Sequence, residues 1–115
     1  MPGKLTTHVL DTANGCPADD MKIELRDAGG QLLAECRTNP GGRCEAALLI
    51  GDSLQRGQYQ LRFHVGEYFR SRNMAVGQPA FLEVVPVDFG IADPEASWHI
   101  PLLVSPWAYS TYRGS

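Results

Sequence analysis

Four separated parts of this sequence carry side chains that could do chemistry. His8 and His99 each stand in a short β-like run, and histidine titrates close to neutral pH, so it can accept or donate a proton. Arg43 opens another such run, and a guanidinium offers a rigid fork of N–H donors to anionic oxygens. The fourth part is the final tetrapeptide, which also brings the α-carboxylate: Tyr112, Arg113, Gly114 and Ser115.

This tetrapeptide is unusual, because chain ends are commonly polar segments that fray. It closes residues 98–115, in which two β-like runs flank a break at Ser105 and Pro106. A phenol, a guanidinium, a hydroxyl and a carboxylate at the edge of an apolar strand suggest that this end of the chain is used.

The histidines have a structural explanation beside a functional one. Alternate residues of a strand share a face, so His8 lies with Thr6 and Leu10, and His99 lies among equally apolar neighbours. A lone histidine on an apolar face is usually a satisfied core residue. The functional explanation requires both histidines, Arg43 and the tail to converge in space, which spacing cannot show. The remaining histidine, beside Arg62 on a polar face, is expected to be solvated: His64.

The elements that position these groups follow from apolar alternation. Residues 21–27 alternate well, and residues 31–37 follow a Gly-Gly turn as their hairpin partner. Pro86 lies inside a later run and indicates an edge strand or a bulge. Residues 66–74 are the one segment with helical character. We predict eight short strands, at residues 5–11, 21–27, 31–37, 43–49, 58–65 and 81–89, and on either side of the break at 105–106.

Eight short strands separated by turn residues are typical of an antiparallel β-sandwich. The length of 115 residues fits one domain, 1–115. A net charge of −3 gives no electrostatic footprint for nucleic acid, and no apolar run approaches the about 20 residues of a membrane span. We expect a soluble, cytoplasmic protein without a signal segment. Its three cysteines lack a metal-binding spacing and are expected to be free thiols: Cys16, Cys36 and Cys44.

Three blocks of the sequence resemble the transthyretin-like 5-hydroxyisourate hydrolases. They read LTTHVLD followed by GCPA at residues 5–18, TN and GRC within 38–44, and residues 99–115 with their Ser-Pro break and final YRGS. The resemblance covers residues 5–115. True transthyretins, which bind thyroid hormone, share the fold of this family and lack both histidines and the tetrapeptide, so the chain resembles the enzyme branch.

The resemblance implies an all-β, transthyretin-like sandwich of two four-stranded sheets with one short helix. It implies a homotetramer, a dimer of dimers, with active sites in the channel where the dimers meet. The implied reaction is the hydrolysis of 5-hydroxyisourate to 2-oxo-4-hydroxy-4-carboxy-5-ureidoimidazoline, on the route from urate to allantoin. No metal, organic cofactor, nucleic acid or membrane is implied.

By resemblance, the catalytic residues are His8, His99 and Ser115, and the substrate-binding residues are His8, Arg43, Tyr112, Arg113 and Gly114. Hydrolysis of a ring amide needs an activated water, a proton acceptor and charge stabilisation. We assign water activation to His8 or His99, with His99 ahead because it borders the C-terminal block, and the other histidine would orient the water or protonate the leaving nitrogen.

The remaining site residues have supporting roles in this hypothesis. Arg43 would bind oxygens of an anionic, urate-like ring. Arg113 would share that role or hold the tail in place. The Ser115 hydroxyl would relay a proton or bind substrate, and Gly114 would let the backbone approach a ligand closely.

Two further expectations concern the assembly of the protein and the positions at which it departs from the family pattern. The histidine-bearing face is too apolar to stay open, so a second dimer should cover it and a dilute monomer should be inactive. The family usually has Asp-Gly-Arg where this chain has Gly41, Gly42 and Arg43, and tyrosine where it has Trp98, so we expect activity with altered channel packing.

Two alternatives predict different behaviour. A carrier would hold a planar aromatic ligand in the channel without catalysis. A purely structural sandwich would have no small-molecule site, and His8→Ala and His99→Ala would then change only its stability.

Overall fold

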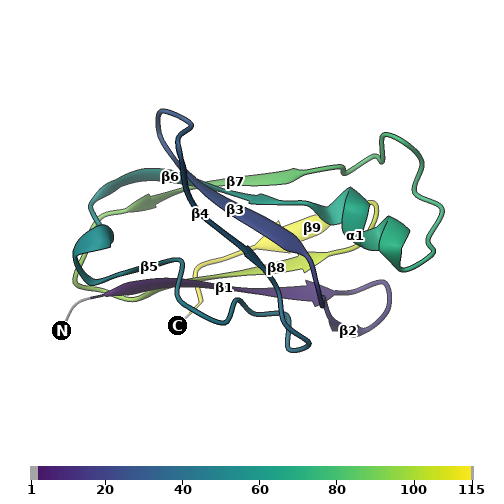
Figure 1. The fold of residues 1–115 in the computed structure, drawn as a ribbon, viewed down its shortest axis with the longest axis horizontal. Helices are drawn as coiled ribbons and strands as arrows, with labels where there is room; N and C mark the ends of the chain where they lie inside the picture. Colours follow the sequence, from purple (N-terminus) through teal and green to yellow (C-terminus); the bar gives the residue numbers. More distant parts are fainter. Residues whose placement is uncertain (1–2, 115) are drawn as a thin grey trace.

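Two β-sheets, one short α-helix and a 3₁₀ turn at Gly51–Ser53 make up the computed structural model, which describes residues 3–114 (Figure 1). The sheet that carries both histidines, here the site sheet, runs in the order β2-β1-β8-β9, with β5 also paired to β1. The opposite sheet runs β4-β3-β6-β7. The strands are β1 (Lys4–Asp11), β2 (Cys16–Pro17), β3 (Lys22–Asp27), β4 (Leu32–Arg37), β5 (Leu49–Ile50), β6 (Gly57–Phe63), β7 (Val85–Ile91), β8 (Trp98–Val104) and β9 (Tyr109–Thr111).

The expected sandwich is confirmed, with two corrections in the site sheet. That sheet has five strands rather than four, because β2 and β5 add short pairings to β1. Its central pair, β1 and β8, is parallel, with Leu5 opposite Trp98 and Asp11 opposite Val104, so the sandwich is not purely antiparallel. Parallel neighbours need a long connection, and nearly the whole chain lies between these two strands. Their register places Thr6 opposite His99.

Alternation decides which side chains fill the core. On β1, Leu5 and Val9 are fully buried, whereas Thr6 and His8 are half-buried on the outer face. The same rule holds on β8, where the core-facing residues are Ile100, Leu102 and Val104. The opposite sheet supplies further core residues: Ile23, Leu25, Leu61, Phe63, Val85 and Val87. Burial of these inner faces holds the two sheets together and turns the histidines outward.

The helix lies close to its predicted position. α1 spans Val65–Ser71. It begins one residue earlier than the predicted segment 66–74, and its last residue comes three residues before the predicted end. The Tyr68 hydroxyl donates to Asp11 Oδ2 at 2.8 Å and ties the helix to the end of β1. No helix in residues 3–114 is long and apolar enough to cross a membrane.

Two of the predicted strands differ in their bounds from the strands of the structure. Residues 43–49 form a bridge at Arg43 and the short strand β5 rather than a continuous strand. Residues 81–84 form turns, and Phe81 is exposed, so β7 begins at Val85. The expected β3–β4 hairpin is present, and β7 is an edge strand, as Pro86 indicated.

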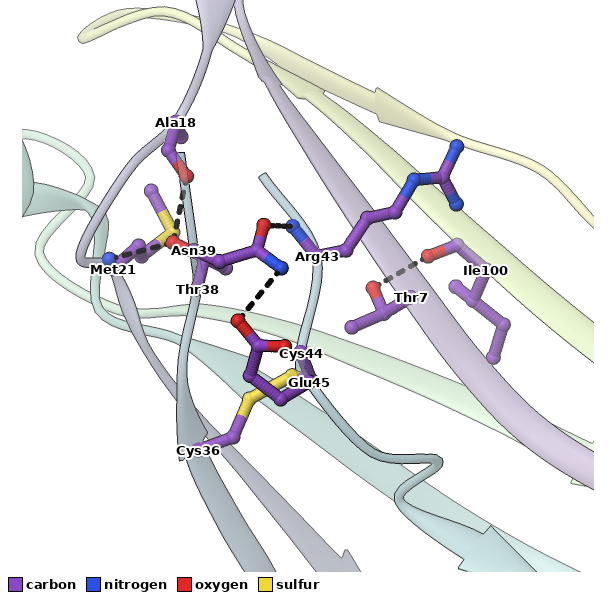
Figure 2. Close-up of a disulfide and its surroundings, with 10 residues drawn as sticks. All are labelled: Thr7, Ala18, Met21, Cys36, Thr38, Asn39, Arg43, Cys44, Glu45 and Ile100. Atoms are coloured by element: carbon purple, nitrogen blue, oxygen red, sulfur yellow. Dashed lines mark hydrogen bonds between the residues drawn. A yellow bond between two sulfur atoms is a disulfide. The ribbon is translucent and has the colours of Figure 1, made fainter. Parts of the chain in front are cut away.

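The expectation of three free thiols is wrong. Cys36 and Cys44 form a disulfide with a Cα–Cα distance of 6.1 Å, and Cys16 is a free, exposed cysteine (Figure 2). Spacing alone could not show this pairing, because the fold brings the end of β4 beside the segment that follows Arg43.

The expectation of a solvated His64 is also wrong. This histidine follows β6 and is half-buried, with Nε2 lying 2.8 Å from Glu24 Oε1. Glu24 also accepts a bond of 2.9 Å from Arg26, and the bond from His64 is the largest cause of the lowered pKa of Glu24. His64 therefore belongs to a hydrogen-bonded network around Glu24 on the opposite sheet.

Candidate functional site

The outer face of the site sheet brings the two predicted histidines together. His8 on β1 and His99 on β8 come from adjacent strands, with ring centroids 6.5 Å apart and ring planes inclined by 30°. Both side chains are half-buried. Water or a substrate atom between two such rings could exchange a proton with either of them.

Arg43 lies on the other side of β1 from β8. It forms an antiparallel bridge with His8, and the carbonyl oxygen of Gly42 accepts a bond of 2.8 Å from Val9 N–H. Gly42 has a φ of +78°, and a Cβ there would lie 2.4 Å from the carbonyl oxygen of Val9. Only glycine fits this approach to β1, so Gly42 sets the position at which Arg43 leaves the sheet.

The loop that carries Arg43 is organised by Asn39. Asn39 Oδ1 accepts bonds from the N–H groups of Gly41 at 3.0 Å and Arg43 at 3.1 Å. Asn39 Nδ2 donates to Glu45 Oε1 at 3.2 Å, and the backbone N–H of Asn39 donates to the carbonyl of Arg43 at 2.8 Å. Figure 2 shows Asn39 between Arg43 and Glu45, with the Cys36–Cys44 disulfide beside them. The acidic residue missing before Arg43 is thus not needed to close this loop.

The base of the loop is fixed by Thr38. Its buried hydroxyl donates to the carbonyl of Ala18 at 2.6 Å and accepts a bond of 2.8 Å from Met21 N–H (Figure 2). Since both bonds are buried, they are retained more strongly than exposed ones. The loop is therefore anchored to the core at one end and to β1 at the other.

Gly114 lies against His99. Its N–H donates to the carbonyl of His99 at 2.6 Å, and the two residues form an antiparallel bridge. A Cβ on Gly114 would lie 2.8 Å from His99 Cδ2. The tail thus packs on the ring of the proposed base, which requires a residue without a side chain.

Thr6 is a site neighbour that the sequence did not single out. Its Oγ1 lies 2.8 Å from His99 Nδ1. One feature of the sequence could have identified Thr6. It lies two positions before His8 in the same strand, so both side chains point to the same face of the sheet. Asn39 was missed as well, although an Asn followed by Pro and Gly is a recognisable turn signal.

The electrostatics of the site favour neutral histidines. Burial lowers the pKa of His8, the positive charge of Arg43 lowers it further, and the backbone of Gly41 acts in the opposite direction. Burial likewise lowers the pKa of His99, followed by the charges of Arg43 and His8. A neutral imidazole at neutral pH can accept a proton. No group of three or more His, Cys, Asp or Glu side chains within residues 3–114 could hold a metal ion.

The other tail residues lie apart from the histidine pair. The Arg113 guanidinium lies 3.7 Å from the centroid of the Trp98 ring and donates to the carbonyl of Ser97 at 3.2 Å. Of the two roles expected for Arg113, these contacts fit holding the tail, and Trp98 supplies the aromatic platform. Tyr112 is 60% exposed and lines a groove with Arg113 between β7 and β9. Ser115, the third expected catalytic residue, lies outside the described residues.

The chain is similar to several known proteins. The profile of the HIUase/Transthyretin family matches residues 5–114. The 5-hydroxyisourate hydrolase of Ralstonia nicotianae is 54% identical over 116 residues, covering 98% of this chain and 99% of that protein.

Two solved structures share the fold. The Klebsiella pneumoniae 5-hydroxyisourate hydrolase superposes with a TM-score of 0.84 at 32% identity and covers 98% of this chain and 99% of its own. An (S)-allantoin synthase superposes with a TM-score of 0.94 at 46% identity over 99% of this chain, which spans 44% of that longer chain. With 54% identity to one relative and a family match over residues 5–114, the chain belongs to the HIUase/transthyretin family.

Proposed function

We propose that this chain is a 5-hydroxyisourate hydrolase, which converts 5-hydroxyisourate to 2-oxo-4-hydroxy-4-carboxy-5-ureidoimidazoline in the degradation of urate to allantoin. The observation that carries the proposal is the convergence of His8, His99, Arg43 and Gly114 on one outer sheet face. Several relatives at about half identity over nearly the full chain are 5-hydroxyisourate hydrolases, which favours a hydrolase over a carrier.

The chemistry begins with a water molecule at the histidine pair. Neutral His99 takes a proton from water as the water oxygen bonds to a ring carbonyl carbon, whose C=O becomes a tetrahedral oxyanion. Collapse of this intermediate breaks the C–N bond, and the proton passes to the leaving nitrogen directly or through His8. A positioned base of this kind contributes about 10²–10⁴ in rate.

Arg43 supplies the positive charge of the site. Its guanidinium binds oxygens of the anionic ring and balances the charge that develops on the oxyanion. The same charge lowers the pKa of both histidines, so substrate binding and preparation of the base depend on one residue. Gly114 and Arg113 hold the tail against His99 and Trp98, and Ser115 relays a proton or binds substrate.

The active form in this proposal is a homotetramer, a dimer of dimers. The outer face of the site sheet carries Leu10 and Leu103 beside the histidines, and both are half-buried within the single chain. A second dimer over this face would bury these apolar groups and exclude water from the site.

The compartment proposed is the cytoplasm. Disulfides such as Cys36–Cys44 are more common in oxidising compartments, so cell fractionation tests this assignment. Recovery of the chain in the cytoplasmic fraction is the expected result, and recovery outside the cytoplasm would contradict it.

An assay of spontaneous decay tests the function. 5-Hydroxyisourate is generated in situ from urate with urate oxidase, and its ultraviolet absorbance is followed with and without the protein. We expect strong acceleration by the wild type and none by His99→Asn. Binding of the compound without acceleration would replace the hydrolase by a carrier, and neither binding nor acceleration would overturn both.

A further inference from the structure

We propose that Thr6 is a positioning residue for the reaction, which fixes the ring orientation and the tautomer of His99. The inference rests on the proposed function in one respect, namely that His99 is the base. Its structural part rests on contacts of the described residues alone.

The Thr6–His99 contact is built into the strand register. The two residues are opposite each other in the parallel β1–β8 ladder, and Thr6 Oγ1 lies 2.8 Å from His99 Nδ1 on the outer face. In residues 3–114 this is the one side-chain hydrogen bond that the Thr6 hydroxyl makes. The ladder on both sides of the pair keeps the hydroxyl and the ring at this distance.

The opposite edge of the ring is also held. The backbone of Gly114 approaches so closely that a Cβ there would lie 2.8 Å from His99 Cδ2. Nδ1 and Cδ2 are the two ring atoms bonded to Cγ, so contacts on both sides prevent the ring from rotating. Nε2, at the far end of the ring, is the nitrogen left to act on water.

The proposed role of Nε2 determines which nitrogen must carry the proton. A neutral imidazole carries its proton on one nitrogen, and the partner of the other nitrogen decides which one. If Nε2 is the base, Nδ1 must carry the proton and donate it to Thr6 Oγ1. In the proposed state the hydroxyl oxygen accepts this bond, which stabilises the Nδ1–H tautomer and leaves the Nε2 lone pair free.

Substitution of Thr6 separates positioning from folding. Thr6→Val keeps the shape and removes the hydroxyl, whereas Thr6→Ser keeps the hydroxyl. The matched control is Thr12→Val, because the Thr12 hydroxyl also bonds to β8, at the carbonyl of Val104 over 3.1 Å, without contacting His99.

We expect Thr6→Val to lower kcat by about 10- to 100-fold, the size of effect found when a metal-binding histidine loses the partner that orients it. KM should change little, because the Thr6 hydroxyl is already bonded to His99. Thr6→Ser should recover most of kcat, and Thr12→Val should keep it.

The acid limb of the pH profile should move to lower pH in Thr6→Val, because the lost acceptor no longer stabilises the protonated ring. Wild-type kcat and an unchanged pH profile in a folded Thr6→Val protein would overturn the proposal.

Nitrogen NMR gives a readout independent of turnover. With ¹⁵N-labelled histidine, the wild type and Thr6→Ser should show His99 protonated at Nδ1, and Thr6→Val should show a mixture or the other tautomer. A wild-type ring protonated at Nε2 would overturn the tautomer assignment. If the wild type shows the expected tautomer but does not hydrolyse 5-hydroxyisourate, the proposed function fails and the contact stands.

Discussion

At the scale of single residues, the site depends on two glycines and a hydroxyl as much as on its ionisable groups. Gly42 brings the Arg43 loop to β1, Gly114 lets the tail pack on His99, and Thr6 holds the ring from its other edge. The proposed chemistry therefore rests on close backbone approaches that a larger side chain at either glycine would disturb.

Gly114→Ala tests the contact of the tail with His99. The added Cβ would lie 2.8 Å from Cδ2, so either the ring or the tail must move. We expect kcat/KM to fall about tenfold or more, equivalent to about 1.4 kcal/mol of transition-state stabilisation, with little change in Tm. Gly90→Ala is the control, because a Cβ there has its nearest neighbour at 3.7 Å. Full activity of Gly114→Ala would remove this contact from the mechanism.

The pH dependence of activity should reveal the charge of Arg43. A base must be neutral to accept a proton, so activity is lost as pH falls through its pKa. Burial and Arg43 both lower the pKa of His8 and His99 below the usual 6.5, so the acid limb of kcat/KM should lie below pH 6.5. Arg43→Gln removes one of these causes and should move the limb to higher pH, while raising KM through lost substrate contacts.

Arg56→Gln is the control for this experiment, because Arg56 is exposed and influences neither histidine pKa. Its pH profile should match the wild type. An acid limb that stays in place in Arg43→Gln would mean that burial alone sets the histidine pKa values.

Much of the site could be predicted at this scale. The residue types of His8, His99 and Arg43 and the resemblance of their motifs identified a set of side chains that the fold brings together. The roles of Thr6 and Asn39 could not be predicted, because they depend on the β1–β8 register and on the path of one loop. Neither is visible in the spacing of residues along the chain.

At the scale of elements, the segment between β4 and β5 joins the two sheets at the site. Asn39 closes its internal hydrogen bonds, and the disulfide links Cys36 at the end of β4 to Cys44, the neighbour of Arg43 (Figure 2). Movement of this segment would displace Arg43 from His8.

Reduction of the disulfide should therefore affect both stability and substrate binding. A crosslink over a separation of 8 residues stabilises a protein by about 2–3 kcal/mol through loop closure. We expect Cys36→Ser/Cys44→Ser to lose about this free energy of unfolding in urea, and KM to rise as Arg43 becomes less confined. Cys16→Ser should change neither. Unchanged KM in the double variant would show that hydrogen bonds alone position Arg43.

Elements with a strong local pattern were predictable, and those defined by distant partners were not. Alternation identified β3, β4 and β6 closely, and Pro86 correctly indicated an edge strand. A strand was predicted at residues 43–49, yet side-chain bonds and a crosslink hold much of this segment. The parallel direction of β1 and β8 was missed, since local pattern carries no information on which strands become neighbours.

At the scale of the whole molecule, the outer face of the site sheet carries both the proposed active-site residues and apolar side chains. If a second dimer covers this face, activity and assembly should fail together. Leu103→Lys places a charge on the face, opposite Ser110 and away from His99 along β8. We expect it to weaken the proposed tetramer and lower specific activity most at low protein concentration.

Leu33→Lys is the matched control for assembly. Leu33 is 40% exposed on β4 of the opposite sheet, so a lysine there should leave both assembly and activity intact. Analytical ultracentrifugation and activity are measured over the same dilution series. A Leu103→Lys protein that stays fully active as a monomer would refute the link between assembly and catalysis.

The pairing of β1 with β8 also affects the order in which secondary structure and catalytic activity form during folding. Thr6 and His99 are separated by 93 residues in the chain, whereas the β3–β4 hairpin closes locally. Contacts between distant residues form slowly, because the loop between them must first be ordered. During refolding, catalytic activity should return after most of the circular-dichroism signal of the β-strands has returned. Activity would then report the last step of folding, when the first and last large strands of the site sheet meet.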